Sequence, residues 1–150
     1  MPEKMNRAHR GHIYWAEVLM TDALIAHIFT ASRDVRYVAV YGEDGLRSQV
    51  RSDLRESSSS ETDRYEELFV NPALLTLATQ RGNLDCGGVR FLIVAYGNFY
   101  QLVRPLRHGH LSVCVELAAD PVRVAALIEP LVAMRDHVPL ASPREPLGLS

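Results

Sequence analysis

The residues of this chain whose types and spacing could support chemistry are few, and two pairs of histidines come first. His9 and His12 lie in the segment HRGH, and His108 and His110 lie in RHGH. Such spacings could contribute to a metal site, but no carboxylate or thiol lies near enough in sequence to complete one. The second pair falls at an expected hairpin tip. We therefore expect its histidines to be solvated polar residues.

The two cysteines are the next candidates. Cys86 and Cys114 are separated by 28 positions and form no CxxC motif. This is neither a disulfide framework nor a zinc ligand set, and it suits a reducing compartment. We interpret Cys114 as a small buried hydrophobic residue. Cys86 would be reactive if a neighbouring cation, Arg81 or Arg90, lowered its pKa.

Phosphate-binding and covalent chemistry find little support in the sequence. Gly87-Gly88 precedes a strand-like run instead of following one, so we interpret it as a turn. Lys4 is the only lysine beside fifteen arginines, and near the terminus it serves neither a P-loop nor a Schiff base. The serine-rich segment 53–62 could accept phosphate, but we interpret it as a flexible loop. We expect no cofactor, no metal and no catalytic residue.

Bulk composition indicates one soluble domain. The chain has 150 residues, a net charge of −2, 47% hydrophobic residues and 23% charged residues. One core is the default at this length, and the charge gives no reason to expect nucleic acid. We expect a domain over 13–135, a polar N-terminal extension over 1–12 and a proline-rich tail over 136–150. The apolar stretch after residue 12 is too polar for a signal peptide or a membrane span, so we expect a cytoplasmic protein.

Helices and strands that would position these residues follow from periodicity and turn signals. A helix is expected over 13–31. A second begins at Pro72, with Asn71 as its cap and Gly82 as its end, and a third runs from Asp120-Pro121 to Arg135, kinked or divided by Pro130. The five expected strands cover residues 36–41, 46–52, 89–96, 99–106 and 111–117.

The resulting order is α-β-β-α-β-β-β-α. Five strands in two hairpin-linked sets, separated by a helix, predict an α+β fold with a mainly antiparallel sheet and helices on both faces. The second strand alternates a charged face with an apolar one, which is typical of a protected sheet edge.

This order resembles the roadblock/dynein light chain family, of the type that regulates small GTPases in bacteria. Val35–Leu46 (VRYVAVYGEDGL) is similar to the first hairpin of the family, Gly97–Glu116 to its central meander and Asp120–Met134 to its closing helix. Profilin-like and longin-like domains have the nearest related architectures. The resemblance implies that the third strand lies at a sheet edge and pairs with its copy in a second subunit.

That third strand supplies the expected dimer interface. An open apolar edge would invite aggregation, and pairing about a two-fold axis removes it. The alternative is a central strand covered on both faces. The interface residues are expected to be Val89, Arg90, Phe91, Leu92, Ile93, Val94, Ala95 and Tyr96.

By the same resemblance, the protein is expected to be a non-enzymatic homodimer that binds a small Ras-like GTPase and modulates its nucleotide cycle or scaffolds its complexes. The expected partner-binding residues lie on the helix that begins at Pro72: Ala73, Leu74, Leu77, Ala78 and Arg81. Two alternatives remain. A profilin-like or PAS-like ligand-binding module would need a sizeable apolar pocket with a few polar groups between sheet and helices. A small enzyme would use Cys86 or a histidine.

Overall fold

The computed structural model describes residues 7–54 and 60–135, with the side chains of residues 18–54 and 61–134. Lys4, the centre of the serine-rich segment and the proline-rich tail lie outside the described residues. Within them, no helix is long and apolar enough to cross a membrane.

Five strands form one fully antiparallel sheet. They are β1(Val35–Gly42), β2(Gly45–Val50), β3(Leu92–Ala95), β4(Tyr100–Pro105) and β5(His110–Val115). Their order across the sheet is β2-β1-β5-β4-β3. Short turns join β1 to β2, β3 to β4 and β4 to β5, so these pairs are hairpins, while β5 lies between β1 and β4 and joins the two sets. The expected α+β fold is confirmed.

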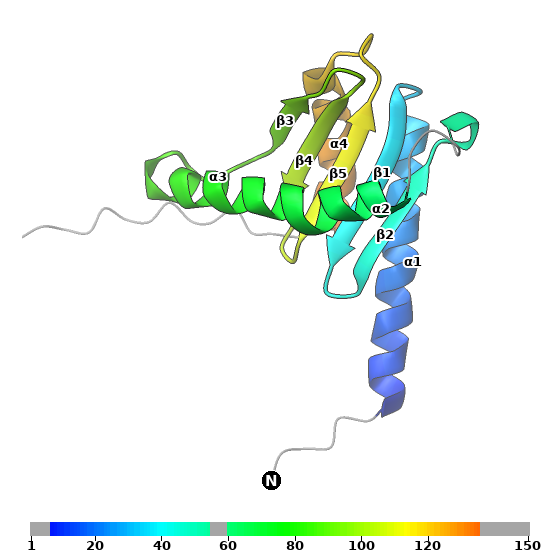
Figure 1. Cartoon of the computed structure of the whole chain (residues 1–150). Helices are drawn as coiled ribbons and strands as arrows, with labels where there is room; N and C mark the ends of the chain where they lie inside the picture. The colour runs from blue at the N-terminus through cyan, green and yellow to red at the C-terminus, as the bar shows by residue number, and fades with distance from the viewer. Residues whose placement is uncertain (1–6, 55–59, 136–150) are drawn as a thin grey trace, which may run out of the picture.

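Helices cover both faces of the sheet (Figure 1). α1(Arg7–Ala31) and α4(Pro121–Arg135) lie on one face, and a long helical segment that includes α2(Ser60–Tyr65) and α3(Asn71–Asp85) crosses the other. The main core lies between the sheet and the α1–α4 layer. Its fully buried members are Ile28, Val35, Val38, Leu111, Val113, Val115, Ile128 and Val132.

The opposite face of the sheet has a smaller core. Tyr37, Ala39 and Cys114 form it, and Val50 and Phe99 pack around it. Cys114 is thus buried, as expected from the sequence. Because this second core has few side chains, it does not fill the space between this face of the sheet and the helices that cover it.

The helix on that face differs from the expected one. It runs from Ser60 through the π-helical turn η2(Glu66–Val70) to Asp85, so its expected bounds at Asn71 and Gly82 are wrong. Asn71 has helical angles and caps nothing; its side-chain amide donates to Glu67 at 3.1 Å instead. The turn that ends the helix uses Gly87 and Gly88, with φ of 78° and 89°.

Gly82 has a different role from the cap predicted for it. A Cβ there would lie 3.0 Å from Val89 Cγ2 and 3.1 Å from the carbonyl carbon of Gly88. The chain therefore folds back against the helix at this position, and the absence of a side chain permits the close approach.

The remaining elements need smaller corrections. α1 begins at Arg7, before the expected start at residue 13, and β3 is shorter than the run 89–96. Asp120 caps α4 as expected, because its carboxylate accepts hydrogen bonds from the backbone N–H groups of Val122 and Arg123. α4 continues through Pro130, so this proline does not divide it.

Candidate functional site

The strand β3 lies at an edge of the sheet, which rules out the central position considered as the alternative. It pairs only with β4 among the described strands. One row of its backbone N–H and C=O groups therefore has no strand beside it. Such a row is a template for strand addition.

The eight residues of the expected interface do not behave alike. Phe91 and Ile93 pack against the main core, while Arg90 is exposed and lies over the Phe91 ring at 5.6 Å. Ala95 is exposed at the edge. The Tyr96 hydroxyl donates to Glu66 at 2.9 Å, which ties the end of this segment to the helix above. The remaining residues (Val89, Leu92, Val94) are partly buried.

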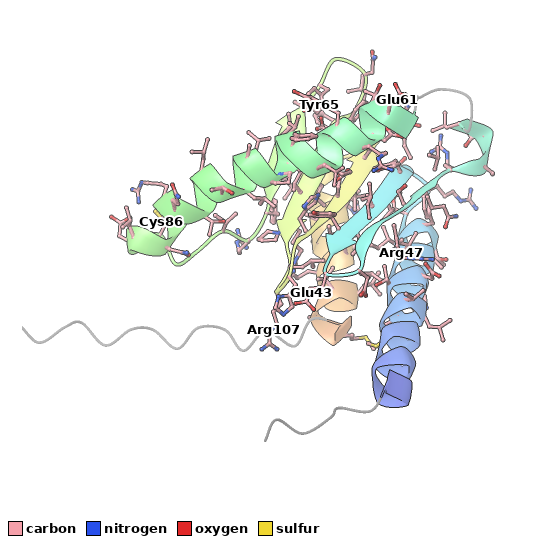
Figure 2. The ribbon with its side chains drawn as sticks, turned by 60° about the horizontal axis from the view of Figure 1, so that its bottom comes forward. Glu43, Arg47, Glu61, Tyr65, Cys86 and Arg107 are labelled. Carbon is pink, nitrogen blue, oxygen red and sulfur yellow. The ribbon has the colours of Figure 1, made fainter. Side chains whose placement is uncertain are left out.

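The helix α3 continues past this same edge. Figure 1 shows its C-terminal half extending beyond β3, and Figure 2 shows Cys86 at its far end. Leu77 is 67% exposed and Leu84 is 79% exposed, so the extended part carries apolar side chains into solvent. A helix face of this kind, next to an open strand edge, is typical of a surface that another protein covers.

The expected partner-binding residues share one side of α3. Ala73, Leu77 and Arg81 are exposed and four positions apart, while Leu74 and Ala78 are partly buried beside them. That spacing places the exposed three on one helical face.

Cys86 has both a cation and an anion beside it. Arg81 Nη1 lies 3.2 Å from its sulfur and ion-pairs with Asp85, whose Oδ1 is also 3.2 Å from the sulfur. The arginine predicted to activate the thiol is therefore shared with a carboxylate. That pairing lowers the pKa of Asp85. The positive charge of Arg81 therefore acts on Asp85 as well as on the cysteine.

A buried polar cluster joins the helix to the sheet, and sequence reasoning missed it. Glu67 and His110 are fully buried, with Glu67 Oε2 2.6 Å from His110 Nε2, and Asn71 donates to the same oxygen. The expectation of a solvated His110 is wrong, whereas His108 is exposed near Glu43. Strand alternation was the missed signal, since it places His110 on the same face as the buried Cys114.

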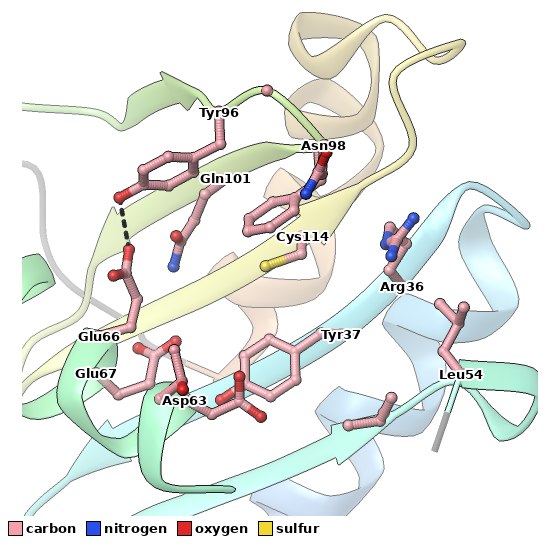
Figure 3. A pocket seen from close by; sticks show the side chains of 14 residues that line it. Arg36, Tyr37, Leu54, Asp63, Glu66, Glu67, Tyr96, Asn98, Gln101 and Cys114 are labelled. Carbon is pink, nitrogen blue, oxygen red and sulfur yellow. Dashed lines mark hydrogen bonds between the residues drawn. The ribbon is translucent and has the colours of Figure 1, made fainter. Parts of the chain in front are cut away.

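A cavity of about 490 Å³ lies beside this cluster, between the sheet and the helix formed by α2 and η2. Tyr37, Phe99 and Cys114 supply its apolar part from the sheet. Figure 3 shows carboxyl groups of Glu66 and Glu67 entering it from the helix. This is the location that a small-ligand module requires.

Burial shifts the ionisation of several groups around the cavity. It raises the pKa of the Tyr37 phenol and of the Cys114 thiol. It raises the pKa of Tyr96 to about 12, helped by the hydrogen bond to Glu66. The pKa of Glu66 is also raised by burial, which the same hydrogen bond partly offsets. Burial is the largest cause of the shift in all four groups.

Comparison with solved structures gives a consistent answer. The chain is similar to a roadblock/LC7 domain from Streptomyces avermitilis (TM-score 0.59, 15% identity), with 75% of this chain and 92% of that domain covered. It is also similar to an MglB with a tetrameric arrangement (TM-score 0.54, 12% identity, 79% and 92% covered). For MglC from Myxococcus xanthus the TM-score is 0.51 at 9% identity, with 77% and 95% covered.

Comparisons of the sequence gave no match. No protein-family model matches it, and no curated protein matches it. The similarity covers 75–79% of this chain and 92–95% of each of these solved chains. The chain therefore has the roadblock fold.

Proposed function

We propose that this protein is a non-enzymatic, homodimeric regulator or scaffold that binds a small Ras-like GTPase in the cytoplasm and modulates its nucleotide cycle. One observation carries the proposal: α3 projects past the open edge of β3 with Leu77 and Leu84 exposed. A second copy would pair with that edge and place its own sheet under the projecting helix.

The chemistry of this surface supports recognition more than catalysis. Among the expected partner-binding residues, Ala73, Leu77 and Arg81 are exposed, and Arg81 is paired with Asp85. Roadblock domains, by the resemblance described above, act on GTPases by positioning or scaffolding. An effect on hydrolysis would then come from positioning the partner's own residues.

Leu77→Asp tests the surface on α3. Leu77 is 67% exposed, so the change should alter the free energy of unfolding by no more than about 0.5 kcal/mol. If this position is buried at an interface, the carboxylate that the substitution introduces would weaken binding by about 2 kcal/mol, or roughly thirtyfold. The measurements are calorimetric binding to a small Ras-like GTPase and the hydrolysis rate of that GTPase with and without this protein.

Leu127→Asp is the matched control, because Leu127 is a 46% exposed leucine on α4, in the other helical layer. It should leave binding unchanged. Wild-type protein that neither binds the GTPase nor alters its hydrolysis would refute the function while leaving the fold intact.

A further inference from the structure

The cavity between the sheet and the α2–η2 segment has features that the proposed GTPase-binding role does not use. Three buried side-chain atoms of its lining lack a hydrogen-bond partner among the described residues: the Tyr37 hydroxyl, Glu67 Oε1 and Gln101 Oε1. A buried polar atom left without a partner is destabilising by about 1–3 kcal/mol. Of the three, the oxygens of Glu67 and Gln101 act as acceptors, so each of them requires a donor.

The other hydrogen-bonding atoms of these two side chains are already engaged, which fixes the orientation of the side chains. Glu67 Oε2 is bound to His110 and Asn71, and Gln101 Nε2 donates to Ser112 at 2.7 Å. The unpaired oxygens are therefore held in place by contacts outside the cavity. Figure 3 shows both side chains directed toward its interior.

Charge and shape indicate the class of ligand. Asp63, Glu66 and Glu67 place three carboxyl groups along the helical wall. Arg36, the one basic residue among those described as lining the cavity, is bound to Glu116 at 3.0 Å. The helical wall is thus acidic, and Glu67 Oε1 on it lacks a donor among the described residues.

Aromatic rings complete the lining on the opposite side. Tyr96 and Phe99 lie with their ring centroids 5.3 Å apart, and Tyr37 contributes a third ring. Aromatic faces attract cations and pack against apolar groups. Within the described residues, no group of three or more histidine, cysteine or acidic side chains is arranged to hold a metal ion.

We propose that this cavity is a binding site for a small organic cation, with an N–H-bearing amine or guanidine head against Glu67 Oε1 and Gln101 Oε1 and an apolar body against Tyr37 and Phe99. The head supplies the donors that these two buried acceptors lack. The volume of about 490 Å³ is within the range of small-molecule sites.

Ligand-observed NMR and calorimetry on the full chain test the site, with 2-phenylethylamine, tryptamine and agmatine as probes and 2-phenylethanol as the uncharged counterpart of the first. We expect saturable binding of at least one amine, and 2-phenylethylamine should bind about tenfold or more tightly than the alcohol. Equal binding of the two would overturn the proposal. So would the absence of saturation by all three amines at about 10 mM, a result expected if water alone fills the cavity.

Two substitutions locate the binding. Glu66→Gln preserves an acceptor for Tyr96 and should weaken amine binding severalfold, while Glu67→Gln should weaken it about tenfold, equivalent to about 1.4 kcal/mol. Glu61→Gln, on an exposed position of α2 outside the cavity, is the control and should change nothing. If Glu67→Gln fails to fold, Glu66→Gln decides. Unchanged affinity in the folded variants would refute the site, without bearing on GTPase binding.

Discussion

Glu116 is the residue at which three segments of the chain meet. Its two carboxylate oxygens accept hydrogen bonds from Arg36 of β1 at 3.0 Å and from Arg51, just after β2, at 2.9 Å. Arg51 also binds Asp53 at 2.7 Å, so the contacts form a network. Burial alone would raise the pKa of Glu116, but the two guanidinium groups outweigh it and hold the pKa below its ordinary value.

Glu116→Gln should therefore reduce the pH dependence of stability on the acid side. Because the folded-state pKa is lowered, the contribution of Glu116 is present above the ordinary pKa of a glutamate, about 4.3, and is lost as the pH falls through the folded value. We expect the variant to lose about 1 kcal/mol at pH 7 and less at pH 3. Urea unfolding at both pH values measures this. Glu43→Gln, at an exposed hairpin tip, should leave the difference between the two pH values unchanged.

The buried pair of Glu67 and His110 shows what single-residue reasoning could not reach. The sequence places His110 next to a glycine turn, and such positions are normally solvated. Its burial depends on a helix that begins far away in the chain and passes directly over the start of β5. No local pattern encodes that crossing. The same limit explains why the acidic wall of the cavity was not predicted.

At the scale of elements, the Asn71-Pro72 dipeptide was the strongest helix-start signal in its region and was still misleading. A proline inside a helix lacks an N–H and crowds the preceding turn. Here the wider η2 turn precedes it, with the Asn71 N–H bonded to the Glu66 carbonyl, five positions back. A π-type turn of this kind lets the helix pass a proline. By contrast, Asp120-Pro121 does begin a helix. The Asp120 carboxylate accepts hydrogen bonds from the free backbone N–H groups of the first turn, whereas the Asn71 side chain accepts none from the backbone of the described residues.

Gly82→Ala should be destabilising although it lies inside α3. In an exposed helix interior this change usually stabilises by about 0.5–1 kcal/mol. At Gly82 the new methyl would meet Val89 Cγ2 at 3.0 Å and the Gly88 backbone at 3.1 Å, so the returning chain must move. We expect a net loss of about 1 kcal/mol in denaturant unfolding. Gly97→Ala, where nothing lies within 4 Å of the added Cβ, is the comparison and should be close to neutral. A stabilised Gly82→Ala variant would contradict this account of the turn.

For the whole molecule, the hairpins were accessible from sequence, because short turns such as Glu43-Asp44 and Gly97-Asn98 force antiparallel neighbours. The pairing of β1 with β5, which joins the two sets of strands, follows from no such turn and was not predicted. The alternation of β2 predicted its place at an edge. The length of β3 was not accessible. Its apolar run begins at Val89, but the chain up to Phe91 is used to return from α3 and does not pair.

Backbone geometry makes the proposed pairing of two β3 edges testable without disturbing the monomer. The Tyr96 N–H donates to the Phe99 carbonyl at 3.0 Å, and in an antiparallel ladder such bonds alternate along the strand. The N–H groups of Val94 and Tyr96 therefore point toward β4, and those of Ile93 and Ala95 point toward the open edge. Ala95 is also exposed, so a substitution there leaves the core untouched.

Ala95→Pro should consequently separate the dimer into folded monomers. Proline removes the outward donor and places its ring at the edge, which edge strands tolerate but paired strands do not. We expect the dimer dissociation constant to rise about tenfold or more, measured by light scattering or sedimentation over a concentration series, with unchanged circular dichroism. Ser48→Pro makes the same change on the opposite edge, at an exposed position of β2 whose N–H also points away from its neighbour by the same alternation. It should leave the mass unaltered. A wild-type protein that is monomeric at micromolar concentration, or an Ala95→Pro variant that stays dimeric, would mean that β3 does not form the seam, and the projecting part of α3 would then need a different partner to cover it.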